Sequence, residues 1–264
     1  MSYYRFSGYL WWFYEEHSED VRPGTTLNDV LKLYDFDATL RTHVMDLAQV
    51  IEVWLRGAFA NHVANVHGPM GYLSPGIHSH DKAFRRDLAS LEETLKRDSP
   101  EKFVAAFRSK YGDKYPPIWM ATELMSFGLL SKWYDNLRED SLRKAIAMEA
   151  GLNQHVLSSF LRMFSVLRNG AAHHARIWNR RTSLRGVHVR RPPALLENAL
   201  TDADESRIHY VLAIAAYIVQ QVDPEGRGVE ALRAHLLTAE DHWLGEMDFP
   251  EDFEADPLWA PTSR

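Results

Sequence analysis

A segment in the second half of the chain combines arginines, an asparagine and a histidine at helical spacing. These polar side chains recur at steps of three, four and seven residues, which places them within an arc of about 60° on one helix face. The face comprises Arg162, Asn169, His173, Arg176 and Arg180. Guanidinium groups match pairs of phosphate oxygens, and an imidazole exchanges a proton near neutral pH. The face therefore suits a polyanionic ligand, and RNA or DNA is the obvious candidate.

The charge around this face has one sign. Between Ala150 and Leu196 the sequence holds eight arginines and no aspartate or glutamate. The whole chain has a formal net charge of -6, so the residues outside this basic stretch carry -14. Because opposite charges four residues apart stabilise a helix, an exposed helix usually carries both signs. The distribution favours a local phosphate-binding face over a protein that coats nucleic acid through its total charge. Basic exposed helices are nevertheless common, so a merely polar helix end is an equally open interpretation.

The helix that carries this face is predicted over residues 153–178. Opposite the polar face, apolar residues form a stripe that a core would cover. The stripe comprises Leu157, Phe160, Phe164, Leu167, Ala171, Ala175 and Trp178. Arg168 departs from this division, because it lies about 100° from the face of Asn169 and His173 on an ideal helix.

Helical periodicity also dominates the rest of the chain, and the alternation typical of strands is essentially missing, so the predicted fold class is all-α. A long helix is predicted to begin after Thr26, which forms a capping box with Asp29, and to run to about residue 66 with a break near Asp35. Gly68-Pro69 ends it. Further helices are predicted over 81–96, 100–111, 117–136, 140–150, 206–222 and 226–237.

This pattern divides the chain into three parts. Residues 1–190 are predicted to form one helical domain, and the C-terminal helices within 191–237 pack on it. Residues 238–264 hold an excess of carboxylates and are predicted to form a mostly solvated acidic tail. The alternative is that this tail folds over the basic stretch and screens its charge.

Composition and missing motifs exclude several kinds of site. The chain has no cysteine, which removes disulfides, thiolate zinc sites and cysteine nucleophiles and fits a reducing, cytoplasmic location. No signal or membrane segment is visible. Neither an H-E-x-x-H motif nor carboxylates at ligand spacing accompany His62, His67, His78 and His80, so no metal is predicted. No glycine-rich phosphate loop is present, so no nucleotide cofactor is predicted.

Two further groups of residues have open interpretations. Aromatic residues near the start of the chain either stack on bases or, as we favour, pack in a core or an interface. They are Tyr3, Tyr4, Tyr9, Trp11, Trp12, Phe13 and Tyr14. Glu52 and Glu123 lie on otherwise apolar helices. Each either orients Arg168 or a helix terminus through a charge-assisted hydrogen bond or forms a structural ion pair, in the case of Glu52 with Arg56.

The segment LRNGAAHHARIWNR, residues 167–180, contains an arginine, a polar residue, three further residues and a histidine. It resembles the signature of the AbiD/AbiF abortive-infection proteins, a branch of the HEPN superfamily. Shorter stretches resemble the same family in the same order: YYRFSGY (3–9), LYDFD (33–37), IEVWLR (51–56), HGP (67–69) and WMATELMSFG (119–128). The resemblance covers about residues 2–181.

The resemblance implies a HEPN-type helical bundle with additional helices, which cleaves RNA as a metal-independent endoribonuclease against phage or as a growth-arresting toxin. It makes Arg168 and His173 the catalytic pair and Asn169 their polar partner. His173 would move a proton at the ribose 2′-oxygen or the leaving oxygen, and Arg168 would stabilise charge on the phosphorane. Supporting residues would be His174 and Glu123, and RNA-binding residues Arg162, Arg176, Arg180 and Arg181.

The resemblance also implies partners. Because Arg168 and His173 do not share a helix face, we expect a homodimer that completes the site across its two-fold axis, unless Gly170 distorts the helix. The other expected partners are RNA and a neutralising RNA or protein antitoxin, and no membrane is expected. Family members usually begin with another helical segment, so the start of this chain is expected to be truncated or to use a later codon.

Two other functions stay open. One is a non-catalytic HEPN module that binds RNA or a protein through the same face. The other is a structural homo-oligomer without a nucleic-acid role, which would show no salt-sensitive retention of RNA.

Overall fold

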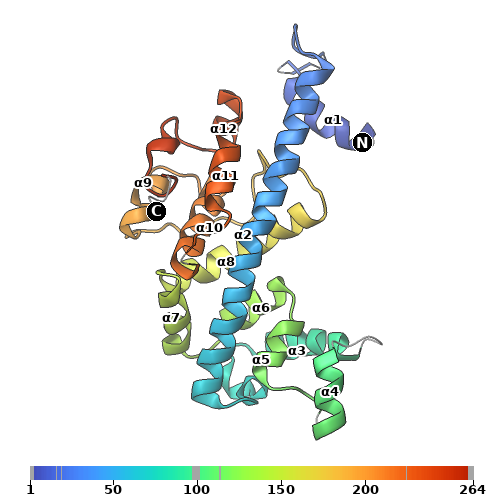
Figure 1. Ribbon diagram of the computed structural model, residues 1–264, viewed down its shortest axis with the longest axis vertical. Helices are drawn as coiled ribbons and strands as arrows, with labels where there is room; N and C mark the ends of the chain where they lie inside the picture. The colour runs from blue at the N-terminus through green and yellow to red at the C-terminus, as the bar shows by residue number, and fades with distance from the viewer. Residues whose placement is uncertain are drawn as a thin grey trace.

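The computed structural model describes residues 3–15, 17–18, 20–96, 102–112, 114–223 and 225–260. The fold class is all-α, as predicted, because these residues are 67% helical and form no strand. Figure 1 shows the helices gathered around one long helix, α2, which runs through most of the length of the molecule. Within the described part, no helix combines the length and the apolar character needed to cross a bilayer.

Most elements follow one another with short connections, but residues 173–193 form a long connection between α8 and α9. The α-helices are α1 (Tyr3–Leu10), α2 (Leu27–His67), α3 (Asp81–Lys96), α4 (Lys102–Tyr111), α5 (Ile118–Leu124), α6 (Phe127–Asp135), α7 (Asp140–Glu149), α8 (Gln154–Ala172), α9 (Ala194–Leu200), α10 (Ile208–Val222), α11 (Val229–Leu236) and α12 (Asp241–Glu246). Short 3-10 helices lie at Trp11–Phe13, Gly71–Leu73, Pro75–Ile77 and Phe253–Ala255.

Helix α2 is the axis of the fold and has 41 residues. Its start is the predicted one, since the Thr26 hydroxyl accepts from the Asp29 N–H and the Asp29 carboxylate accepts from the Thr26 N–H. Its C-cap is Gly68, whose φ of 76 suits a residue without a Cβ. The predicted break near Asp35 is wrong. Asp35 is exposed while residues on either side of it are buried, so the apolar stripe continues without interruption.

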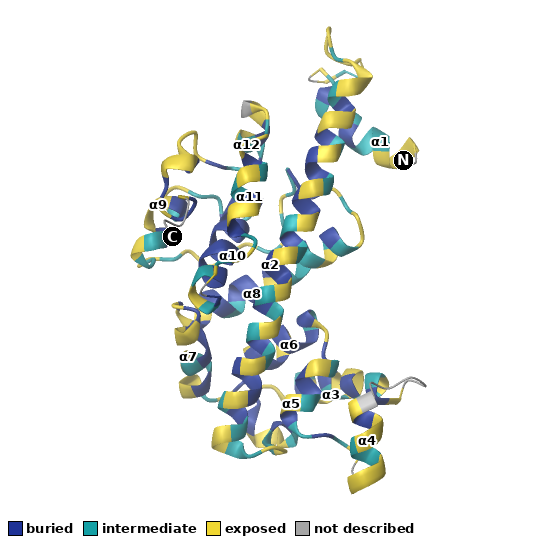
Figure 2. Ribbon diagram, in the orientation of Figure 1, coloured by how far each residue is buried: buried dark blue, intermediate teal, exposed yellow. Residues whose placement is uncertain are grey.

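The core forms where other helices cover α2. Helices α5, α7, α8, α10 and α11 all contact it. Every residue of α10 from Ile208 to Val219 is buried, as expected of a helix that is apolar all round. Figure 2 shows the buried residues concentrated where α2, α8 and α10 meet and the exposed residues along the outer helix faces. The helix that carries the predicted site is therefore anchored along its apolar side.

Several predicted helix bounds differ from the structure. The helix predicted over 117–136 is two helices, α5 and α6, because Met125 is extended and Ser126 caps the start of α6. The helix predicted over 100–111 is described only from Lys102, and residues 97–101 lie outside the described part. Helices α1, α9 and α12 were not predicted, and each has only six to eight residues.

The C-terminal segment is not a mostly solvated tail, contrary to the prediction. The described part of it buries Trp243, Met247, Phe249, Phe253, Leu258 and Trp259. It is also tied to α10, since the His209 N–H donates to the Met247 carbonyl at 3.1 Å and the Gln220 side chain donates to the Leu258 carbonyl at 2.9 Å. The carboxylates of this segment predict exposure to solvent. The apolar side chains between them are nevertheless buried, and their burial determines how the segment packs. Residues 261–264 of the predicted tail lie outside the described part.

Candidate functional site at the end of helix α8

Helix α8 ends at Ala172, and the prediction that it continues to residue 178 is wrong. Its C-cap is His173, whose N–H donates to the carbonyl of Asn169 at 3.0 Å. His173 is exposed, so its imidazole lies at the open end of the helix, on the same face as Asn169. The helix therefore ends at its C-cap, His173, and the part of the predicted polar face beyond it, Arg176 and Arg180, does not lie on the helix.

The chain leaves α8 through a turn that places His174 in an unusual conformation. The His174 N–H donates to the Ala171 carbonyl at 3.0 Å, and the Ala175 N–H donates to the Gly170 carbonyl at 2.8 Å. These two bonds form a Schellman motif, in which the residue after the C-cap is left-handed and is usually glycine. Here that residue is His174, with a φ of 57. The turn thus holds a second histidine, next in sequence to the first, in a backbone conformation that is unfavourable for a residue with a Cβ.

A buried carboxylate fixes the segment that follows this turn. The Oδ1 atom of Asp37 on α2 accepts from the amides of Ile177 at 3.1 Å and Trp178 at 2.8 Å. Asp37 is fully buried, and it also binds the Tyr9 hydroxyl at 2.5 Å and the Arg41 guanidinium. Burial raises the pKa of Asp37, and its bonds to Tyr9, Arg41 and the two amides oppose that rise. These donors all favour the ionised carboxylate.

Helix α1 closes the other side of the same turn. Nη1 of Arg5 donates to the His174 carbonyl at 3.3 Å, and Arg176 donates to the Gly8 carbonyl. Arg41 reaches the Ala175 carbonyl at 3.4 Å. The turn that carries the two histidines is therefore held by α1 and α2 together, and the guanidinium of Arg176 is engaged with backbone.

Arg180 and Arg181 lie beyond the helix and not along its face. A Cβ on Gly170 would be 3.0 Å from Nη1 of Arg180, so Arg180 folds back over the last turn of α8. Glycine at this position leaves room for that guanidinium, and the helix passes through Gly170 without a break. Arg181 is exposed in the connection to α9. Of the four predicted RNA-binding arginines, only Arg162 lies on α8.

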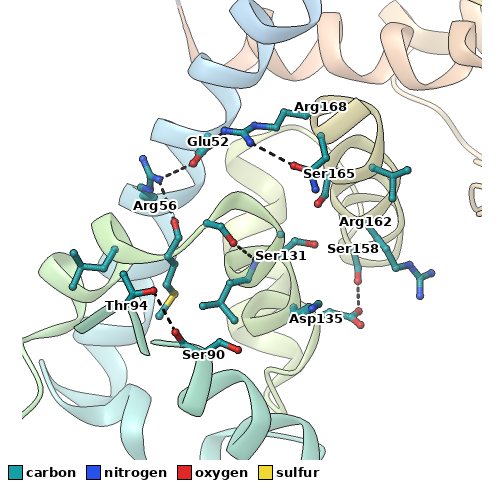
Figure 3. Close-up of a pocket in the computed structure, with 18 of the residues that line it drawn as sticks. Glu52, Arg56, Ser90, Thr94, Ser131, Asp135, Ser158, Arg162, Ser165 and Arg168 are labelled. Atoms are coloured by element: carbon teal, nitrogen blue, oxygen red, sulfur yellow. Dashed lines mark hydrogen bonds and ion pairs between the residues drawn. The ribbon is translucent and has the colours of Figure 1, made fainter. Parts of the chain in front are cut away.

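Arg168 projects towards α2 and joins a network of charges (Figure 3). Its Nη2 atom is 3.6 Å from Oε2 of Glu52, and Glu52 also binds Nη2 of Arg56 at 2.6 Å. Arg56 in turn donates to the carbonyls of Thr122 and Met125, at 3.1 and 3.2 Å. The ion pair predicted between Glu52 and Arg56 is confirmed, and Glu52 reaches Arg168 as well.

Glu123 has the structural role rather than the orienting one. Its Oε2 atom is 3.8 Å from Nη1 of Arg56, and its side chain is 53% exposed. Glu123 therefore acts on Arg168 at most through Arg56 and Glu52. The closest polar contact of Arg168 on its own helix is the Asn169 Oδ1 atom, 3.4 Å from Nη1.

A polar cleft of about 820 Å³ opens beside Arg168. Helix α8 forms one wall, and α2, α3 and α6 form the others. Six hydroxyl side chains line it: Ser90, Thr94, Ser126, Ser131, Ser158 and Ser165. Figure 3 shows most of these hydroxyl residues around the same opening, with Arg168 and Glu52 at one end and Asp135 at the other. The predicted catalytic residues Arg168 and Asn169 are thus part of a larger polar site.

The structure separates the predicted residues into two groups. Arg168, Asn169 and Arg162 line the cleft, whereas His173 and His174 lie at the end of α8. No contact within the described residues joins the guanidinium of Arg168 to the imidazole of His173. The sequence-based conclusion that they do not share a helix face agrees with this arrangement.

Sequence reasoning missed the residues that hold the site in place. Asp37 and Arg41 lie four residues apart on the apolar stripe of α2, where a charged pair has no solvent to face. That position was an available signal, because charges inside a core are almost always paired with a specific partner. The partners themselves, two backbone amides 140 and 141 residues away, carry no sequence signal.

The remaining sequence candidates have other surroundings. Among the described residues no group of three or more histidine, aspartate, glutamate or cysteine side chains could hold a metal ion. His62 and His67 pair with Glu149 and Glu139, each at 2.7 Å. In the aromatic group, Tyr9 and Phe13 are buried as core residues, while Tyr3, Tyr4 and Trp11 are exposed.

Comparison with known proteins gives one match. The model of a protein family described as Abi-like protein matches residues 1–179, about two thirds of the chain. The match includes α1 to α8 and the turn that follows α8. No curated protein and no protein of solved structure matches the chain.

Proposed function

The chain belongs to the Abi-like protein family, which implies a role in phage abortive infection. We propose that it acts in that role as an endoribonuclease of the HEPN type. The observation that carries this proposal is the end of α8. An exposed imidazole, His173, closes the helix five residues after an arginine that lines a polar cleft. In RNA cleavage without a metal ion, an imidazole can transfer the proton and a guanidinium can stabilise the charge that develops on the phosphorane.

The proposed reaction uses the ribose of the substrate as the nucleophile. His173 accepts the proton of a 2′-hydroxyl, and the 2′-oxygen attacks the adjacent phosphorus. The bond from phosphorus to the 5′-oxygen of the next nucleotide breaks, and that oxygen takes up a proton from water. His173 then releases its proton to water, so the reaction consumes and produces no net proton. The products are a 2′,3′-cyclic phosphate and a 5′-hydroxyl. Arg168 stabilises the extra negative charge on the phosphorane, and Asn169 binds a non-bridging oxygen.

A pair of chains is part of the proposal. In one chain Arg168 projects towards Glu52 on α2, whereas His173 lies on another face of α8. Two copies related by a two-fold axis can bring the Arg168 of one chain near the His173 of the other. The active form is then a homodimer, and a variant of either residue is rescued in a mixed dimer that keeps one intact half-site.

The test is cleavage of end-labelled RNA by wild-type protein and by His173→Ala, each with and without EDTA. We expect cleavage that resists EDTA, leaves a cyclic phosphate end and falls by roughly 10²- to 10⁴-fold in the variant. His155→Ala is the matched control, since His155 is an exposed histidine at the opposite end of α8. Equal cleavage by wild type and His173→Ala would contradict the proposed mechanism.

The engagement of Arg168 by Glu52 favours one second candidate, a non-catalytic module that binds RNA or a protein. An arginine already paired with a carboxylate serves structure as well as chemistry. In that case His173→Ala leaves RNA retention and RNA integrity unchanged, while losing cationic side chains weakens binding.

A further inference from the structure

The cleft beside Arg168 is lined by groups that suit a flexible nucleic-acid strand. We propose that it binds nucleotides of single-stranded RNA on one side of the bond to be cleaved. This inference rests on the proposed function and adds to it the path of the substrate and the residues that bind it.

One line of side chains along α8 leads from the cleft to His173. Its members are Ser158, Arg162, Ser165, Asn169 and His173, at steps of four, three, four and four residues. Such steps keep side chains on one helix face, and the line spans about 22 Å at roughly 1.5 Å per residue. The first four line the cleft and the fifth closes the helix. A strand that follows this line passes from the cleft to the proposed proton carrier.

The cleft carries charged side chains of both signs. Arg162 and Arg168 on the α8 wall and Lys132 on α6 can bind phosphate oxygens. Carboxylates lie at Glu93 on α3 and at Asp135 on α6, where the Ser158 hydroxyl donates to Asp135. Carboxylates accept hydrogen bonds from the amino groups of bases, and hydroxyls donate or accept as the base requires. A strand can therefore set its phosphates against Arg162, Arg168 and Lys132 and its bases against the carboxylates and hydroxyls of the cleft.

The cations of the cleft are not all taken up by internal ion pairs. Glu52 is shared between Arg56 and Arg168. Lys132 and Arg162 are both exposed, on two different walls of the cleft. They are the residues that can bind phosphate without breaking the network that holds α2 to α8.

The size of the cleft selects a single strand. Its volume of about 820 Å³ is that of a pocket for one small molecule or a few nucleotides. A double helix would instead present its phosphates across a wide surface, and its bases would be out of reach of the hydroxyl side chains in the cleft. The bases of a single strand are free to enter.

The experiment measures binding without cleavage, in the His173→Ala background. Fluorescence anisotropy of a short 5′-labelled single-stranded RNA of mixed sequence is recorded over a range of salt concentrations. We expect Arg162→Gln and Lys132→Gln each to weaken binding by roughly tenfold and to lower the slope of log affinity against log salt by about one. Lys144→Gln removes the same charge from an exposed site on α7 outside the cleft and should change neither quantity.

Two further arms sharpen the test. Thr94→Trp fills the cleft without changing its charge and should abolish binding while the far-ultraviolet circular dichroism spectrum stays that of the parent. The same RNA annealed to its complement should bind more weakly than the single strand. The inference is overturned if the cleft variants bind like Lys144→Gln, or if the duplex binds as tightly as the single strand.

These outcomes are separable from those of the proposed function. RNA that is cut by the wild-type protein while the cleft variants bind normally contradicts the cleft and leaves the endoribonuclease standing. RNA that binds through the cleft but is never cut contradicts the endoribonuclease and leaves the cleft standing.

Discussion

Nη2 of Arg168 lies 3.6 Å from Oε2 of Glu52, a carboxylate whose other oxygen binds Arg56 at 2.6 Å. The side chain of Glu52 is only 13% exposed, so its charge is poorly screened and both arginines depend on it. This contact connects α2 to the one proposed catalytic residue that projects away from the helix end. It fixes the direction of Arg168 before any substrate arrives.

We therefore predict that Glu52→Gln lowers RNA cleavage by about tenfold through misplacement of Arg168. As a positioning residue, Glu52 should affect the rate at saturating RNA more than the RNA concentration that gives half the maximal rate. Glu123→Gln is the matched control, because Glu123 contacts Arg56 but not Arg168. Equal losses in the two variants, or a loss explained by unfolding in a thermal melt, would argue against this role.

The left-handed conformation of His174 gives a prediction about stability. Because the position after a Schellman C-cap favours glycine, His174→Gly should stabilise the protein by about 1 kcal/mol in urea denaturation. His174→Ala keeps the Cβ and its strain, so it should bring no gain. If the glycine variant is also less active, the histidine is retained for function at the expense of stability. A glycine variant that is less stable than the alanine variant would contradict the prediction that the left-handed conformation at residue 174 is strained.

The buried Asp37 is predicted to be far more costly to alter than its neighbours. Asp37→Asn leaves the guanidinium of Arg41, whose side chain is 7% exposed, without its buried counter-charge. We expect a loss of about 3–5 kcal/mol in unfolding free energy. Asp35→Asn changes the same residue type two positions earlier on the exposed face and should cost less than about 0.5 kcal/mol. Similar values for the two variants would mean that the buried network contributes little.

Acid should destabilise the fold through His209. Burial lowers the pKa of this residue to about 4. The unfolded chain takes up a proton on His209 below about pH 6.5 and the folded chain only near 4, so stability falls as pH falls between these values. The loss from this residue reaches about 3 kcal/mol. Urea denaturation at several pH values should show a slope that flattens in His209→Leu and persists in His155→Leu, whose imidazole is exposed.

The sequence predicted most of the helices because their ends carry local signals. The Thr26 capping box, the glycine at residue 68 and the start at Asp81 act within a few residues of the chain, so the structure agrees with them. The end of α8 has no such signal. The apolar stripe continues to Trp178, which is buried together with Ile177, but both residues lie in a segment beyond the helix whose amides bind Asp37. Hydrophobic periodicity indicates which residues are buried, but it cannot distinguish a helix from a turn that is held by hydrogen bonds to a buried carboxylate.

The residues that the α8 segment contributes to the candidate site were predictable, but the rest of the site and its arrangement were not. The arginines, Asn169 and His173 are visible in one segment, and the pairing of Glu52 with Arg56 follows from their spacing on a helix. The cleft depends instead on residues from α3, α6 and α8 that meet only in the folded chain. The placement of Arg180 over Gly170 likewise depends on the direction in which the chain leaves the helix.

Helix α2 sets both anchors of the site, since Asp37 and Glu52 lie 15 residues apart within its 41 residues. That spacing places them about 60° apart around the helix and about 22 Å apart along it. Inserting or deleting one residue between them would turn one anchor by about 100° relative to the other. Relatives of this chain should therefore differ in residue type between positions 37 and 52 while aligning there without gaps. Gaps should instead collect in the connections between helices, where a change of length moves no anchor.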